Sequence, residues 1–541
     1  MRHWNSVDAD DVLHQPATGD VQWTTVNLGE VFPGVPTPLN WFSLSATGEQ
    51  GMRSALHAIG VYSRRETRIP ESPAERTTGI QFGRAVANLD TFRGFADRTP
   101  GSSGDAMEAQ IFGSTQPLKK SSRTYRRYPF VFAKLPFAAI QRRRLMDRQS
   151  RDTEHWWRNA VFPQAPHDRL RATEILWDAL RRIAAIFDPH NTMMMVTLGI
   201  YQQVNALTAK TGLAGMEKEL LYTGDTKESE TVCDLWRLSR NQLSLETFLH
   251  RHGFHGPNEN EVSGKVWRED DKPLQALVAR YRAMDDSASP LLANAERMQR
   301  REQAEAQLLG RLKPAQRPMA RLLLRLARHY VPTREIGRDS FLKAMDAVRY
   351  SARVIGADLV RNGLLEQIDD TFYLMPFEMT ELPDDLKRLV ALRRSKRAEY
   401  EKLQVPERWI GLATPQPRVT DAGEGGVEGL GVSGGIVEGR VRVVLDPAAD
   451  ELEDGEILVC STTDPGWASY FFIASGLVID IGGPLSHGAI IARELGLPCV
   501  INARNATRRL HTGDLIRIDG TLGTVEVLER ATEGELECMS N

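Results

Sequence analysis

The sequence predicts a multidomain α+β protein, in which a mainly α-helical body is followed by a small β-rich domain. Between about residues 167 and 405, apolar residues recur every three or four positions, which is the period of amphipathic helices. Beyond the segment 411–427, which is rich in Gly, Pro and acidic residues, short β-branched runs dominate instead. The length of 541 residues is enough for two to four domains.

Composition divides the chain into five parts. They are a loose polar arm (1–20), a mainly helical domain (21–410), a flexible linker (411–427), a small β-rich domain (428–530) and an acidic tail (531–541). Within the helical domain, the Pro-Gly-Ser-Ser-Gly run at 100–104 predicts a flexible excursion between Phe95 and Gly113. The linker would let the small domain visit two sites, although an ordinary interdomain linker has the same composition.

Two long helices are predicted in the body. An apolar face with 4-3-4 spacing begins at Leu176, and the helix that carries it is predicted to end at Asp188-Pro189. A second apolar face runs over residues 341–359, and Gly363 is predicted to end that helix. Thr333 follows a proline near the start of the second helix, so we predict that it is the N-cap.

Bulk properties exclude several classes of protein. The charges nearly balance, with 68 Lys and Arg against 71 Asp and Glu, so no nucleic-acid or membrane-surface partner is expected. The four cysteines are far apart and show no C-x-x-C spacing, which argues against a zinc knuckle and a disulfide framework. The N-terminus is too polar for a signal peptide and no apolar run reaches spanning length, so we expect a cytoplasmic protein.

The segment 481–498 carries the clearest chemical signal. It reads Ile-Gly-Gly-Pro-Leu-Ser-His-Gly at its start and places His487 between a glycine-rich turn and the first turn of a helix. Apolar runs at 476–480 and 499–502 predict buried strands on either side. Free N–H groups and the helix dipole at such a junction favour negative charge. A neutral His487 could therefore act as a nucleophile toward phosphorus and be stabilised once phosphorylated.

The residues around this histidine are the predicted phosphate-binding groups. Glycines let the backbone approach an incoming phosphate closely. The predicted set is Gly482, Gly483, Ser486 and Gly488. The alternative is that Ser486 and His487 only cap a helix, as Ser commonly does.

The segment resembles the phosphohistidine signature of the swivelling domain in phosphoenolpyruvate (PEP) synthase, pyruvate phosphate dikinase and rifampin (rifampicin) phosphotransferase. With its flanks at 462–467 and 519–523, the resemblance covers roughly residues 428 to 530. Stretches of the body at 26–39, 248–269 and 334–374 also resemble rifampin phosphotransferase. The resemblance implies a small β/β/α swivelling domain that carries phosphohistidine, after a helical substrate-binding domain.

Arg334 and Arg338 are one helical turn apart, so they share a face near the start of the second long helix. Two guanidiniums there could neutralise a phosphoryl group in transit. Glu335 lies next to Arg334 and could accept the proton of a substrate hydroxyl. In the resembled family the second position is usually Lys, so Arg338 keeps the charge but changes the geometry. Alternatively, all three are solvated or ion-paired surface residues.

Two further patterns are interpreted as structural. His252, His255 and Glu259 could suggest a metal site, but the intervening glycines and proline predict a turn, not the helix of an H-E-x-x-H site. We interpret this segment as a loop that shapes the substrate pocket, and we expect no metal site. The G-x-G-x-x-G match at 429–434 leads into a predicted strand instead of a helix, so it is not a dinucleotide-binding fingerprint.

The sequence contains no recognisable source of the phosphoryl group. We find neither a P-loop nor the ATP-grasp domain or C-terminal barrel of the resembled enzymes, so no intrinsic cofactor is expected. The arrangement resembles the carrier subunit of phenylphosphate synthase. This resemblance implies a separate ATP-grasp protein that binds ATP and Mg and phosphorylates His487, with AMP and phosphate as by-products.

The leading hypothesis is a phosphotransferase subunit that transfers the phosphoryl group from His487 to a hydroxyl of a small, apolar or aromatic molecule. Phosphorylation could give the final product, or it could activate the hydroxyl as a leaving group, as in a dehydratase. Another phosphohistidine protein could charge His487 in place of an ATP-grasp partner. A non-catalytic regulatory or binding protein that kept the swivelling fold is the alternative from a different class.

Overall fold

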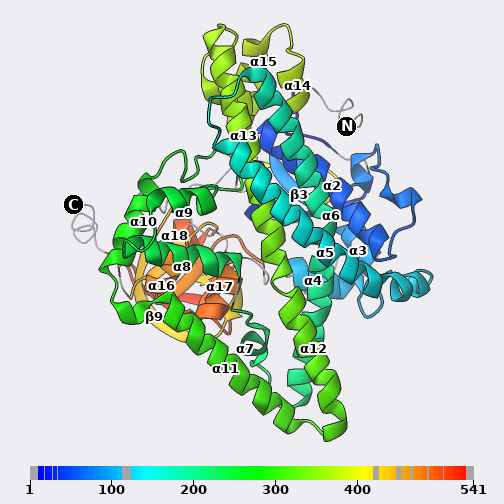
Figure 1. Cartoon of the computed structure of the whole chain (residues 1–541), viewed down its shortest axis with the longest axis vertical. Coiled ribbons are helices and arrows are strands. Elements are labelled where there is room, and N and C mark those ends of the chain that lie inside the picture. Colours follow the sequence, from blue (N-terminus) through cyan, green and yellow to red (C-terminus); the bar gives the residue numbers. More distant parts are fainter. Residues whose placement is uncertain are drawn as a thin grey trace.

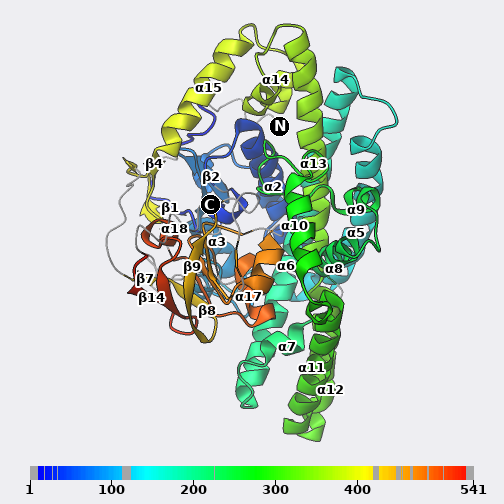
Figure 2. The same ribbon diagram turned by 90° about the vertical axis from the view of Figure 1, so that its left-hand side faces the viewer.

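The structure of the chain, a computed structural model, is shown in Figures 1 and 2. It describes residues 10–16, 19–26, 28–32, 34–112, 124–224, 226–417, 426–445, 452–453, 455–463, 467–483, 487–503 and 505–531. A mainly helical body is followed by a C-terminal domain built on a mixed sheet, which confirms the predicted α+β class. Residues 418–425 of the predicted linker and the acidic tail after Ala531 lie outside the described residues.

The body is organised around two long helices, α6 (Arg169–Lys210) and α13 (Thr333–Arg361). Helices α2 (Pro38–Ala58) and α5 (Tyr128–Val161) pack against this pair (Figure 1). Their apolar faces form the main core, in which fully buried side chains repeat at helical spacing, as the sequence pattern predicted. Helices α1 (Leu28–Val31), α14 (Pro376–Thr380) and α15 (Leu386–Glu401) pack against this core, whereas the buried side chains of α3 (Leu89–Ala96), α4 (Gly104–Phe112) and α7 (Glu217–Leu221) belong to smaller apolar clusters.

Three local predictions about these helices were wrong. Helix α6 continues through Pro189 to Lys210, because packing along its whole length offsets the roughly 3 kcal/mol that an internal proline costs. Thr333 is the first residue of α13, where its hydroxyl donates to the carbonyl of Tyr330, and Pro332 occupies the N-cap position. The region predicted as an excursion from Phe95 contains the helix α4. Gly363 does follow the end of α13, with a φ of 73°.

A four-stranded sheet joins the two ends of the body. Its order is β2 (Thr78–Gln81), β3 (Arg84–Asn88), β1 (Gln22–Thr24) and β5 (Arg408–Ile410), all antiparallel. The predicted loose arm is also partly ordered. Residues 10–16 pack on the body, where Val12 and Leu13 are 3% and 2% exposed within the main core. Removing these apolar side chains from water favours the ordered arrangement. Residues 1–9, 17 and 18 lie outside the described part.

Helices α8 (Lys227–Ser239), α9 (Leu245–His252), α10 (Lys272–Ala283) and α11 (Pro290–Arg311) form a second layer of the body. Helix α12 (Arg317–Tyr330) returns from α11 as the second arm of a hairpin that projects beyond the rest (Figures 1 and 2). The C-terminal domain contacts this layer at α10, where the guanidinium of Arg280 lies over the Tyr470 ring of that domain at 4.6 Å (Figure 1).

The C-terminal domain is an eight-stranded sheet with helices on both faces. Its order is β7 (Val427–Glu428), β14 (Thr524–Glu529), β13 (Leu515–Asp519), β9 (Ile436–Val443), β10 (Ile457–Cys460), β11 (Gly476–Ile479), β12 (Cys499–Ile501) and β8 (Leu430–Ser433). The central strands β9 to β12 are parallel. Helices α16 (Ala468–Ile473) and α17 (His487–Leu495) cover one face, and α18 (Ala506–Arg509) covers the other. A small ribbon of β4 (Leu403–Gln404) and β6 (Gln416–Pro417) precedes the domain.

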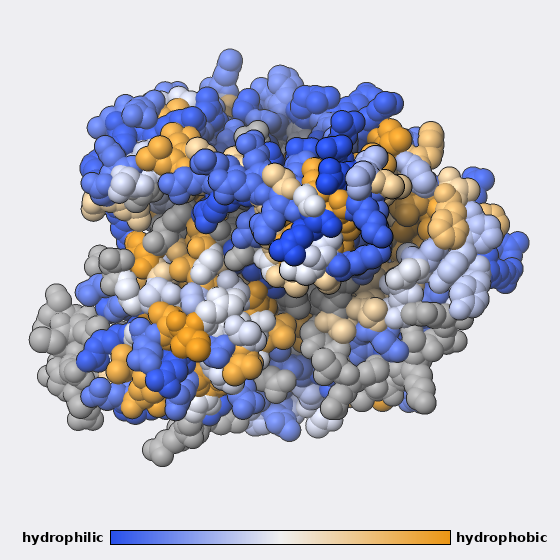
Figure 3. Space-filling model, turned by 90° about the horizontal axis from the view of Figure 1, so that it is seen from below, coloured by the Kyte–Doolittle hydropathy of each residue, from blue (hydrophilic) through white to orange (hydrophobic). Residues whose placement is uncertain are grey.

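None of the described helices combines the length and the hydropathy that crossing a bilayer would require. The face of the molecule in Figure 3 is mainly hydrophilic, and its apolar groups are scattered between charged ones. Scattered apolar side chains of this kind are ordinary on a protein surface.

Candidate active site between the body and the C-terminal domain

Around His487 the structure describes a strand, the two glycines that follow it and a helix, whereas residues 484–486 lie outside the described part. Strand β11 ends at Ile479 and α17 begins at His487, as the sequence predicted. Gly482 and Gly483 are buried in the turn. Ser486 and the side chain of His487 lie outside the described part, so their phosphate-handling roles stay predictions.

Gly488 is needed for the close packing of α17. A Cβ atom at this position would lie 2.4 Å from Cδ1 of Ile479 and 2.8 Å from Oγ1 of Thr463. Contacts this short cannot occur without movement of the neighbours, so a side chain here would force Ile479 and Thr463 to move. The glycine therefore lets the first turn of α17 pack closely, and its role in phosphate approach stays a prediction.

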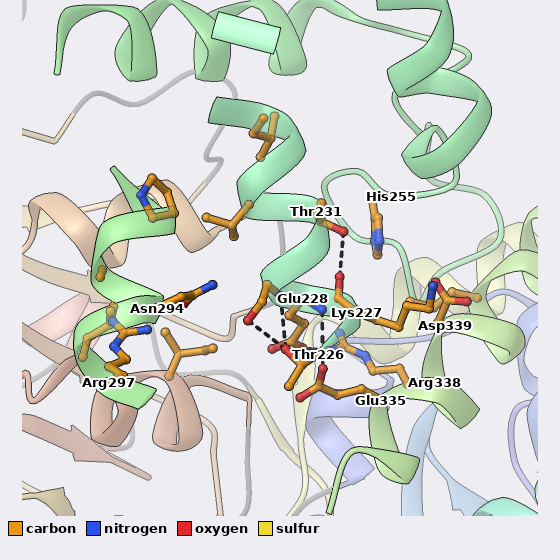
Figure 4. Close-up of a pocket in the computed structure, with 18 residues that line it drawn as sticks. Thr226, Lys227, Glu228, Thr231, His255, Asn294, Arg297, Glu335, Arg338 and Asp339 are labelled. Atoms are coloured by element: carbon orange, nitrogen blue, oxygen red, sulfur yellow. Dashed lines mark hydrogen bonds and ion pairs between the residues drawn. The ribbon is translucent and has the colours of Figure 1, made fainter. Parts of the chain in front are cut away.

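Helix α17 forms one wall of a pocket whose other walls belong to the body. The pocket encloses about 930 Å³, counting the part open to solvent. Its lining comes from the N-terminal half of α8, the loop that holds His255, α11, α13, and Ile491 and Leu495 of α17 (Figure 4). Apolar and charged side chains both line it, as ligand sites require.

Arg338 is the centre of a charged network in this pocket. It donates to Oε1 of Glu228 at 2.9 Å and to Oε1 of Glu259 at 2.8 Å. The carboxylate of Glu259 is fully buried, so its charge needs this partner. Arg338 is thus committed to protein carboxylates, and its role in binding a phosphoryl group stays a prediction.

Glu335 also lines the pocket from α13. It lies one helical turn before Asp339, and both side chains line the same cavity. Oε2 of Glu335 accepts the backbone N–H of Glu228 at 3.4 Å (Figure 4). The carboxylate predicted to act as a base therefore contacts the first turn of α8.

Arg334 and Arg338 do not play equivalent parts in the structure. Both lie on α13, as predicted, but Arg334 is not among the side chains that line this pocket. The electrostatic effect of both guanidiniums reaches His190 of α6. Burial first, and then Arg334 and Arg338, lower the pKa of His190 to about 4.

The histidine-rich loop supplies the pocket with an imidazole. His255 lines the pocket, and its Nδ1 lies 2.7 Å from Oε2 of Glu259. His252 is buried behind it and hydrogen-bonds Asp234 and Thr231, at 2.9 and 3.1 Å. Burial lowers the pKa of His252, although its bond to Asp234 opposes the shift. The segment therefore folds as the predicted pocket-shaping loop.

No metal centre is assembled in the part of the chain that the structure describes. There, no three or more His, Cys, Asp or Glu side chains are grouped so that they could hold an ion. The G-x-G-x-x-G match at 429–434 contains β8 and leads into β9, which is the strand context predicted for it.

Sequence reasoning missed the contribution of α8 and α11. Lys227 and Glu228 open α8, and Asn294 and Arg297 lie on α11 at the edge of the pocket (Figure 4). None of these residues belongs to a motif with a chemical meaning of its own. Their place depends on how α8 and α11 pack against α13, which spacing along the chain does not reveal.

Two family models match the chain. One, described as the mobile domain of PEP-utilising enzymes, matches residues 452–523, and one, described as the fourth domain of rifampicin phosphotransferase, matches residues 216–335. The first covers the segment of His487, and the second covers α8, α11 and the loop of His255. The two matches therefore meet at the pocket.

Curated relatives match over parts of their length. An uncharacterized protein of Mycobacterium tuberculosis is 40% identical over 210 residues, which are 38% of this chain and 25% of that protein. Rifampicin phosphotransferase of Bacillus cereus is 30% identical over 297 residues, which are 53% of this chain and 34% of that enzyme. The chain thus spans about a third or less of the length of these relatives.

The first match shows that the C-terminal domain resembles the mobile domain of PEP-utilising enzymes. Within that class the chain is similar to rifampicin phosphotransferase, through the fourth-domain match and through the aligned relatives. The resemblance predicted from the sequence is confirmed.

Proposed function

We propose that this chain is a phosphotransferase subunit, in which His487 carries a phosphoryl group and passes it to a hydroxyl of a small, apolar or aromatic molecule. The observation that carries the proposal is the position of α17. The helix that begins at His487 lines the same pocket as Glu335 and Arg338. A substrate in that pocket would lie between the carrier helix and the charged groups of the body, which favours group transfer.

The pocket has basic groups that could meet a phosphoryl group in transit, next to the acidic ones. Lys227, Arg338 and the N-terminus of α8 would offset part of its negative charge. We propose that the backbone of the turn and the start of α17 bind the phosphate on the carrier. The proposed groups are Gly482, Gly483, Ser486 and Gly488, with Arg334 as a further phosphate ligand on the body.

The substrate class follows from the rest of the lining. Val232 and Leu235 of α8, Leu342 of α13 and the two aliphatic side chains of α17 give the pocket an apolar wall. Burying an apolar group of the substrate against this wall would contribute about 25 cal/mol for each Å² removed from water. The hydroxyl would then point toward the charged side of the pocket.

We further propose that a separate ATP-grasp protein supplies the phosphoryl group from ATP, and that ATP and Mg bind to this partner. The proposal is supported by the sequence resemblance to carrier subunits. The C-terminal domain would carry the group from the partner to the pocket, which requires it to leave and regain the docked position.

The test is phosphate-affinity electrophoresis after incubation with ATP and candidate ATP-grasp proteins. We expect a shifted band with the right partner and none with ATP alone. His487→Ala should abolish the shift, whereas His329→Gln, on α12 outside the pocket, should keep it. Equal labelling of His487→Ala and the wild type would overturn the proposal.

A further inference from the structure

His255 is held in a fixed position on the pocket wall. Its backbone N–H donates to the carbonyl of His252 at 3.0 Å, and its carbonyl accepts the N–H of Trp267 at 2.7 Å. The side chain is 8% exposed. Figure 4 shows the His255 ring directed into the space between α8 and α13. The imidazole is therefore presented to the pocket by a loop whose backbone is hydrogen-bonded on both sides of it.

The partners of His255 determine which ring nitrogen faces the substrate. Arg338 keeps the buried Glu259 ionised, and an ionised carboxylate can only accept hydrogen bonds. Nδ1 of His255 must therefore donate its proton to Glu259, at 2.7 Å. In the neutral ring, Nε2 is then the nitrogen without a proton. Within the part of the chain that the structure describes, no group hydrogen-bonds Nε2.

Resting on the function proposed above, we propose that His255, oriented by Glu259, is the general base of phosphoryl transfer. The substrate oxygen forms its bond to phosphorus, and its proton passes to Nε2 of His255. The N–P bond to His487 breaks, and its electron pair stays on the ring. When the other nitrogen of that ring is protonated, His487 leaves as neutral imidazole, so charge and atoms balance.

The sequence suggested that Glu335 is the base, but in this scheme Glu335 has a different role. Its carboxylate accepts a backbone N–H of the first turn of α8, from Glu228. It thereby holds the N-terminus of α8 against α13, where that helix end faces the transferred group. Glu335 is a positioning residue, and its loss should alter the geometry of the pocket without removing the proton acceptor.

The test uses the whole chain, phosphorylated chemically on histidine with phosphoramidate, and phenol as the probe acceptor. His487→Ala, treated in the same way, gives the background from other histidines. We expect His255→Gln to lower the His487-dependent formation of phenyl phosphate about 100-fold. Glu259→Gln and Glu335→Gln should lower the rate less, because both variants keep the imidazole that accepts the proton.

Failure of the function and failure of the inference give different results. Product formation in His487→Ala at the wild-type rate would sink the proposed function and this inference with it. A His487-dependent rate that His255→Gln leaves unchanged would overturn the inference alone. As a second measurement, ¹⁵N resonances of His255 should show a protonated Nδ1 and a bare Nε2, and the reverse tautomer would also overturn it.

Discussion

Arg338 and Glu259 form a salt bridge of 2.8 Å between two segments that lie 79 positions apart in the sequence. Glu259 is fully buried, whereas Arg338 is 26% exposed and also binds Glu228. One guanidinium therefore joins α13, the loop of His255 and the start of α8. The shape of the pocket depends on this residue.

Replacement of Arg338 by Gln should lower the free energy of unfolding by about 2 kcal/mol, because the buried Glu259 would lose its charged partner. Urea denaturation gives this value. Arg361→Gln, at a 74% exposed site on the same helix, is the control and should change stability by less than about 0.5 kcal/mol. Equal effects of the two variants would contradict the prediction.

Replacement of Gly337 by Ala should destabilise the body by about 1–3 kcal/mol. The new Cβ would lie 2.3 Å from Nδ1 of His190, at the contact between α6 and α13. Gly199→Ala, in open space on α6, is the matched control and should be neutral or stabilising by up to about 1 kcal/mol. Thermal or urea unfolding of both variants measures the difference, and similar behaviour would refute the clash.

The stability of the body should fall in mild acid through His190. Burial and the two arginines of α13 lower its pKa from 6.5 to about 4, so the folded state resists protonation. This contribution is complete above pH 6.5 and is lost as pH falls toward 4, by about 3 kcal/mol. His190→Gln cannot titrate and should lose less stability over that range. Parallel curves of unfolding free energy against pH for the two proteins would show that the prediction is wrong.

Arg280→Ala should loosen the docking of the C-terminal domain. The guanidinium lies over the Tyr470 ring at 4.6 Å, and such a contact is worth roughly 1 kcal/mol, or about fivefold in population. Spin labels attached to Arg325→Cys and Leu522→Cys would report the docked fraction by electron spin resonance.

The control for this prediction is Lys272→Ala, at the exposed start of α10, which should leave the distance distribution between the labels unchanged. A docked fraction in Arg280→Ala equal to that of the wild type would exclude the contact between Arg280 and Tyr470 as a latch.

The local structure around His487 could be predicted well from the sequence. Glycines and β-branched runs act over a few residues, so the strand, the turn and the start of α17 could be inferred from neighbours alone. The same reasoning failed at Pro189, where long-range packing outweighs a local signal. It also failed at Thr333, since Pro332 already occupies the cap position of α13.

The pocket could be predicted only in part. Arg338 and Glu335 were found through their motif, but the pairing of Arg338 with Glu259 links residues that no spacing rule connects. Strands β1 and β5 pair although almost the whole sequence of the body lies between them, and local sequence patterns do not predict such a pairing. Non-local contacts such as these fix the pocket, and the sequence of one chain does not display them.

The pairing of β1 with β5 has a mechanical consequence for the tether. It anchors the chain at Ile410, and the β4–β6 ribbon extends the anchor to Pro417. The next described residue is Gly426, nine positions later. Nine residues span at most about 30 Å when fully extended. The donor protein proposed above would therefore have to bring its phosphate to a point that the C-terminal domain can reach on a chain of this length.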